Sequence, residues 1–303
     1  MGIIVEPSLD PNGQAIAIVN GLYKNLFDRK ADVDGLRTYV DRLRALGVEH
    51  GIPDIIKEMI FSPEFERNFY YRLSLLDRNK GRTVSGKKIR YVVSLGTHCL
   101  PSFYLKKFGL KSFSLPFDWC FSSAQTVIHC LEDDFSTFLN AAHYRSLTQQ
   151  RQSLEPGAEH VWYFHHHNVG TMFTHRDPTT PEHKAYYDRA VARFRALMKC
   201  DDAKLFLMIT KPNFDSCTPF DTLSAELRSR TSNSAFICVQ LQAPTYESGC
   251  HSMSLLKKDG DHALYSFLPS SYEDGVGFDD PIDDQAIMRL VNQFDLDISE
   301  KLP

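Results

Sequence analysis

The stretch Ile-Arg-Tyr-Val-Val-Ser-Leu occupies residues 89–95, and Gly-Thr-His-Cys follows it at residues 96–99. The first part is rich in β-branched residues, a composition typical of a short strand. Residues 100–110 can form a helix whose second half carries Lys106 and Lys107, where the helix dipole favours cations. A strand, a turn of small residues and a helix in this order form the first unit of an α/β fold.

The same alternation continues to the end of the chain. We expect further strands at residues 161–164, 204–210, 235–241 and 263–268, and helices at 127–139, 186–198, 222–228 and 285–294. Repeated strand-then-helix units favour neighbouring parallel strands joined by crossover helices. The sequence therefore predicts an α/β domain with a mainly parallel sheet and flanking helices, preceded by a small all-α module at the N-terminus.

This N-terminal module is predicted from helical periodicity. Apolar residues recur at three- and four-residue steps over 16–26 and again over 36–46. Gly47 is placed to end a helix, Pro53 to open the next turn, and Ser62-Pro63-Glu64 to begin another. Residues 79–88 are almost free of large apolar side chains. We expect a helical module at 1–78, a linker at 79–88 and an α/β domain at 89–303.

Composition narrows the class of partner. A net charge of -4 over 303 residues argues against nucleic-acid binding, and no apolar run approaches the length of a membrane span. The seven cysteines include no Cys-x-x-Cys pair, so reduced thiols, a cytoplasmic location and no structural metal are expected. We predict a small-molecule, peptide or glycan substrate and no cofactor, and the sequence indicates no oligomeric state.

The candidate site lies where the strands end, because loops leaving the carboxyl edge of a parallel sheet usually hold the ligand. Cys99 would begin a helix there, and the helix N-terminus would lower the pKa of its thiol and supply N–H groups for an oxyanion hole. The alternative is a small buried cysteine that only packs. The candidate binding residues at the strand ends are Ser94, Gly96, Thr97, His98, Lys211 and Asn213.

Further candidates come from the connecting segments. His165, His166 and His167 are consecutive, and one of them could act as general base for Cys99, with Asp118 to orient it. The alternatives are surface histidines, or a metal site that no helical metal motif accompanies. Asp118 could equally cap a helix, and Arg193 could bind a phosphate or simply face solvent.

Two resemblances add to this reasoning. Residues 22–29, 32–36, Tyr39 and 62–65 resemble a small bacterial helical module of unknown function found in proteins connected with surface polysaccharides and large adhesins. Ser94-Leu95-Gly96-Thr97-His98-Cys99, residues 105–107, Ser114 to Trp119, the histidine cluster and Arg193-Phe194 resemble a bacterial family catalogued as papain-like cysteine peptidases.

The second resemblance implies Cys99 as nucleophile and a histidine within 165–167 as base. The chain departs from papain itself, which sets its cysteine-bearing helix before an antiparallel sheet and has a Cys-Gly-Ser-Cys-Trp type of signature. Three functions therefore stay open: a thiol-dependent hydrolase or acyl transferase, a carbohydrate-active transferase acting on a nucleotide-sugar or glycan, and a non-enzymatic binding module in surface-polymer assembly.

Overall fold

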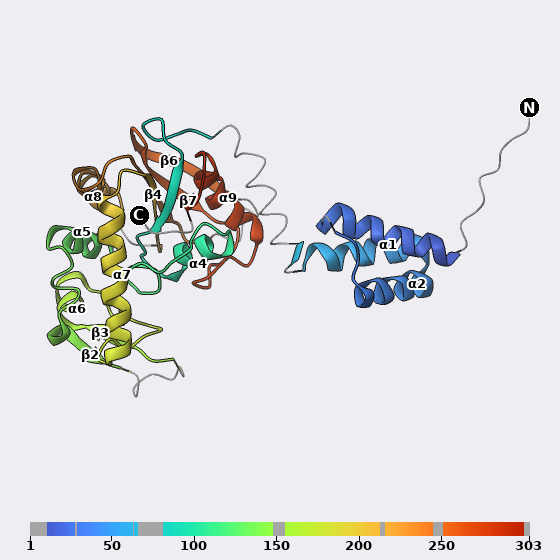
Figure 1. The fold of residues 1–303 in the computed structure, drawn as a ribbon, viewed down its shortest axis with the longest axis horizontal. Helices are drawn as coiled ribbons and strands as arrows, with labels where there is room; N and C mark the ends of the chain where they lie inside the picture. The colour runs from blue at the N-terminus through green and yellow to red at the C-terminus, as the bar shows by residue number, and fades with distance from the viewer. Residues whose placement is uncertain are drawn as a thin grey trace, which may run out of the picture. The chain divides into compact units, whose positions relative to one another are not determined.

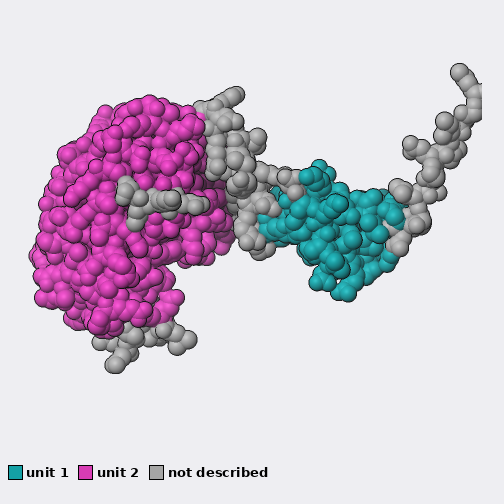
Figure 2. All heavy atoms as spheres, in the orientation of Figure 1, with its two compact units in different colours: residues 1–76 teal, residues 77–303 magenta. Residues whose placement is uncertain are grey.

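The computed structural model describes residues 11–27, 29–62, 64–65, 81–147, 155–212, 216–244 and 251–299. The chain divides into two compact units, residues 1–76 and 77–303, which Figure 2 distinguishes by colour. No described helix is long and apolar enough to cross a membrane.

The first unit is a helical pair, α1 (Pro11–Phe27) and α2 (Val33–Ile60), packed around buried Val19, Val40 and Ile55. Asp32 caps α2 by accepting a hydrogen bond of 2.8 Å from the Gly35 backbone N–H. Gly47 interrupts α2 with a φ of 73°, so the expected helix end is a kink within one longer element.

The second unit is built on a five-stranded sheet with the order β1-β4-β5-β7-β6. Strands β1, β4, β5 and β7 are parallel, and β6 pairs antiparallel with β7. Their bounds are β1 (Ile89–Ser94), β4 (Ala203–Thr210), β5 (Ser234–Leu241), β6 (Ser252–Asp259) and β7 (His262–Leu268). The predicted fold class, a mainly parallel sheet with flanking helices after a helical module, is confirmed.

Helices cover both faces of this sheet (Figure 1). Alternate residues of β4 divide between them: Phe206 and Met208 join a core with α5, α7 and α8, whereas Leu205 and Leu207 join a core with α4 and α9. The helices are α4 (Cys99–Lys107), α5 (Ala124–Glu132), α7 (Pro181–Lys199), α8 (Cys217–Arg230) and α9 (Pro281–Asn292).

One predicted strand is wrong. Residues 161–164 lie in helix α6 (Val161–His167), and the strand before it is β3 (Ala158–His160), which pairs with β2 (Tyr144–Ser146) outside the main sheet. His160 caps α6 by accepting the Tyr163 backbone N–H at 3.3 Å. A run of four apolar residues fits a strand or a helical turn equally well, and the His160 cap favours the helix.

The described part of the predicted linker, residues 81–88, is held by the C-terminal segment of the second unit. Arg82 N–H donates to the Gln293 carbonyl at 2.9 Å, and Asp295 N–H donates back to the Arg82 carbonyl at 3.0 Å. Val84 is 2% exposed. Because these hydrogen bonds join backbone groups, the polar side chains that led us to predict a linker gave no sign of them.

Candidate active site

Cys99 begins helix α4 at the carboxyl end of β1, the predicted place. The intervening turn is fixed to β4, because Leu95 N–H donates to the Leu207 carbonyl at 2.8 Å and Thr97 N–H to the Ile209 carbonyl at 3.0 Å. Gly96 has a φ of 83°, and a Cβ atom there would lie 2.6 Å from Ser122 Oγ. Only glycine fits this turn, which sets where Cys99 stands.

The histidine that contacts Cys99 is His175. Its Nε2 lies 3.4 Å from Cys99 Sγ, and its Nδ1 lies 2.5 Å from Glu155 Oε2. The edge of Trp119 meets the same imidazole ring, with the ring centroids 6.3 Å apart. A thiol, an imidazole and a carboxylate in a row match the relation of nucleophile, base and orienting acid in triad enzymes.

Burial governs the protonation of Cys99. The residue is 8% exposed, and loss of hydration raises the pKa of its thiol above the ordinary value. The Thr174 hydroxyl and Lys211 act in the opposite direction, without reversing the effect. The prediction of a lowered thiol pKa is therefore wrong in direction, because desolvation of the sulfur is the largest influence on it.

The predicted binding residues around Cys99 mainly shape the turn. Ser94 Oγ accepts the Gly96 backbone N–H at 3.3 Å, and Thr97 Oγ1 donates to the Ile209 carbonyl at 3.1 Å. Asn213 lies outside the described residues.

His98 and Lys211 converge on a carboxylate that sequence analysis missed, Glu273. His98 Nε2 lies 3.2 Å from Glu273 Oε1, and Lys211 Nζ lies 3.9 Å from Glu273 Oε2. Burial raises the pKa of Glu273, but the proximity of His98 and Lys211 outweighs burial and holds the pKa below the usual range. His98, Lys211 and Glu273 together connect the segments that follow β1, β4 and β7, next to Cys99.

The predicted histidines occupy a different environment, on α6. His166 stacks on Trp162 with ring centroids 4.1 Å apart, and its Nδ1 lies 2.8 Å from the Trp162 carbonyl. His167 Nδ1 lies 3.1 Å from Thr126 Oγ1, and burial lowers its pKa. His165 is exposed beside Phe164. None of the contacts described for these three side chains reaches Cys99, because α6 follows β3 and not a strand of the main sheet.

Asp118 is fully buried and pairs with Lys111. Its carboxylate also accepts the Leu115 backbone N–H at 2.5 Å, and no histidine contacts it among the residues described. Burial raises the pKa of Asp118, although Lys111 acts against that. Arg193 donates from Nη1 to the Ser114 carbonyl at 3.4 Å. Both residues hold the loop that presents Trp119 to His175.

A cavity of about 480 Å³ lies against His175. We call it the basic pocket, and it is lined by Lys106, Lys111, residues 112–114, Trp119, His175 and Arg176. Its described lining residues include three cationic side chains and no carboxylate, and its size suits a small ligand or a few residues of a polymer.

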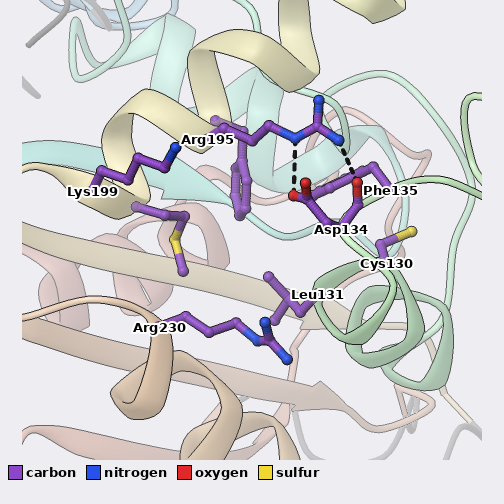
Figure 3. A pocket seen from close by; sticks show the side chains of 9 residues that line it. Cys130, Leu131, Asp134, Phe135, Arg195, Lys199 and Arg230 are labelled. Carbon is purple, nitrogen blue, oxygen red and sulfur yellow. Dashed lines mark hydrogen bonds and ion pairs between the residues drawn. The ribbon is translucent and has the colours of Figure 1, made fainter.

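A second cavity, of about 220 Å³, lies between α5 and α7 and also contains a cysteine, Cys130 (Figure 3). Arg195 is held there by Asp134, with Nε 2.9 Å from Oδ1. Cys130 Sγ turns away from the cavity in Figure 3 and lies 3.1 Å from the Tyr163 hydroxyl. Burial raises the pKa of this thiol well above its ordinary value. The contact described for its sulfur is with the Tyr163 hydroxyl and not with a histidine, unlike that of Cys99.

Within the described ranges, no three His, Cys, Asp or Glu side chains are grouped to hold a metal ion. The six described cysteines form no disulfide.

Comparison with known proteins finds a family match over the part of the chain that contains this site. Residues 90–239 match the family described as "Putative papain-like cysteine peptidase (DUF1796)". This confirms the resemblance seen in the sequence and supports a thiol hydrolase at the level of the family. The matched range includes Cys99, Glu155 and His175.

Among curated proteins, "Uncharacterized protein R408" of Acanthamoeba polyphaga mimivirus is 36% identical over 97 residues, 28% of this chain and 42% of the viral protein. The chain thus spans less than half the length of that relative. No solved structure matches the chain.

Proposed function

We propose that this protein is a thiol-dependent hydrolase in which Cys99 is the nucleophile, His175 the general base and Glu155 the group that orients the imidazole. The observation that carries the proposal is the row of contacts from Cys99 Sγ through His175 Nε2 and Nδ1 to Glu155 Oε2, at 3.4 and 2.5 Å. The family match supports the same chemistry.

The raised pKa of Cys99 determines how the reaction starts. Burial favours the protonated thiol at rest, so His175 Nε2 takes the thiol proton as Sγ attacks the substrate carbonyl. A sulfur–carbon bond forms and the carbonyl oxygen becomes an oxyanion. Backbone N–H groups in the first turn of α4 have no acceptor within the helix, and they are suited to bind it.

The second half of the reaction returns the proton. The imidazolium donates to the leaving group, which departs and leaves a thioester on Cys99. Water, deprotonated by His175, then attacks the thioester, releases the carboxylic acid and restores the thiol. Attack by an amine or alcohol in place of water would give acyl transfer from the same intermediate.

The three side chains are tested by single substitutions assayed on peptides and on p-nitrophenyl esters. Cys99→Ala should abolish turnover, and His175→Ala should lower kcat by about 10²- to 10⁴-fold, the usual worth of a general base. Glu155→Gln should lower kcat less than His175→Ala does, because the general base His175 is still present. His166→Ala is the matched control and should retain full activity. Full activity of His175→Ala would refute the assignment.

A further inference from the structure

The basic pocket contains charges that the hydrolytic reaction does not use. Lys111 is neutralised by Asp118. For Lys106 and Arg176, the described residues place no carboxylate within ion-pair distance. Two positive charges therefore face a cavity of about 480 Å³, and the described residues of its lining include no acid.

These cations lie around one pocket, and Arg176 is held in place. The guanidinium of Arg176 stacks on Tyr186, with Cζ 3.8 Å from the ring centroid. Burial lowers the pKa of Lys111, Asp118 acts against this, and Lys106 and Arg176 lower it further. Like charges gathered around one cavity repel each other unless an anion joins them.

The pocket also adjoins the reacting sulfur. His175 and Trp119 are part of its lining, and His175 Nε2 lies 3.4 Å from Cys99 Sγ. A ligand in the pocket would therefore lie about one imidazole ring from the nucleophile. Ser114 adds a hydroxyl to the lining of the pocket.

We propose that the basic pocket binds an anionic group of the substrate, a carboxylate or a phosphate, close to the acyl group that reacts with Cys99. Lys106 and Arg176 recognise its charge. This assignment rests on the proposed function, and it names the substrate class as acyl compounds that carry a negative charge beside the reacting carbonyl.

Two nearly isosteric reagents test it on the full chain. Iodoacetate is anionic and iodoacetamide is neutral, and with both a sulfur–carbon bond forms, iodide leaves and the thiol proton is lost. The ratio of their rates at Cys99 removes the effect of thiol reactivity and reports local charge. Measured by peptide mapping at pH 7.5, the ratio should be about three- to tenfold higher in the folded protein than for the same cysteine in urea.

Lys106→Ala and Arg176→Ala should each lower this ratio, whereas Lys199→Ala, which removes an exposed cation from the cavity of Figure 3, should not. Protection of Cys99 by acetate or by inorganic phosphate at matched ionic strength distinguishes the two anions. An unchanged ratio on folding would overturn the anion site alone. A Cys99 that reacts with neither reagent would refute the proposed function and this assignment with it.

Discussion

A buried aspartate beside a buried lysine serves packing in this molecule, although its sequence context also fits a catalytic orienting group. The Asp118 carboxylate contacts Lys111 and the Leu115 backbone, and Lys111 Nζ donates to Ser102 Oγ at 2.7 Å. The acid that contacts the active-site imidazole is Glu155. The two roles make different predictions for a single substitution.

Asp118→Ala should lower the free energy of unfolding by about 3–5 kcal/mol, because it leaves the Lys111 ammonium buried without its partner. The double variant Lys111→Met/Asp118→Leu should regain most of that loss. Urea unfolding followed by circular dichroism measures both. If Asp118→Ala were fully stable but inactive, Asp118 would instead have a catalytic role.

At the residue scale, sequence reasoning placed Cys99 at the turn between strand and helix but did not point to His175, the histidine that contacts it. Cys99 follows a recognisable strand and turn, so local pattern was sufficient. His175 is 76 positions away and belongs to no motif; it lies in a polar segment whose contact with Cys99 depends on how residues 155–175 fold back. The histidine triplet was conspicuous in composition, and its position on α6 could not be read from spacing.

At the scale of elements, the turn between β1 and α4 is the part most sensitive to substitution. Gly96→Ala would place a Cβ 2.6 Å from Ser122 Oγ at a φ of 83°. We expect a loss of about 2 kcal/mol or more, together with slower alkylation of Cys99, since α4 must shift.

Gly109→Ala is the matched control, because Gly109 also has a positive φ, 66°, but its Cβ would meet no atom within 4 Å. Gly109→Ala should lower the free energy of unfolding only by the cost of holding an alanine at a positive φ, about 1 kcal/mol. Thermal unfolding of the two variants gives the difference. Equal losses would show that the contact with Ser122 does not constrain the turn.

The elements themselves were largely predictable where a strand and its helix alternate in sequence. β4, β5 and β7 were found because each is a run of buried apolar residues. β6 was missed because its pattern is mostly exposed, as an edge strand allows. Residues 161–164 were assigned to a strand because four residues are too few to show a helical period.

At the scale of the whole molecule, two buried histidines make stability depend on pH. His160 and His262 are 0% and 1% exposed, and burial lowers the pKa of each to about 4. The neutral His160 ring is hydrogen-bonded to the Thr137 carbonyl and the Tyr163 backbone N–H. The neutral His262 ring is hydrogen-bonded to the hydroxyls of Ser224 and Ser234. A folded pKa below the unfolded value of about 6.5 gives stability that is complete above pH 6.5 and is lost as the pH falls towards 4.

Each histidine should therefore contribute at most about 3 kcal/mol of acid-sensitive stability. The free energy of unfolding in urea should fall less between pH 7 and pH 4.5 in His160→Gln and in His262→Asn than in the native chain. His165→Gln, at an exposed site, should leave the difference unchanged. An identical difference in all four proteins would mean that carboxylates alone cause the acid sensitivity.

The central claim, that His175 activates Cys99, is tested most directly by the rate at which iodoacetamide alkylates Cys99 near pH 7, mapped by mass spectrometry. Because burial keeps the thiol protonated, the account predicts that His175→Ala slows alkylation of Cys99 by at least about tenfold, since the base that accepts the thiol proton is gone. His166→Ala should have no effect, and Cys238, whose pKa burial raises to about 12, should stay unlabelled in every variant. An unchanged rate of Cys99 alkylation in His175→Ala would contradict the account.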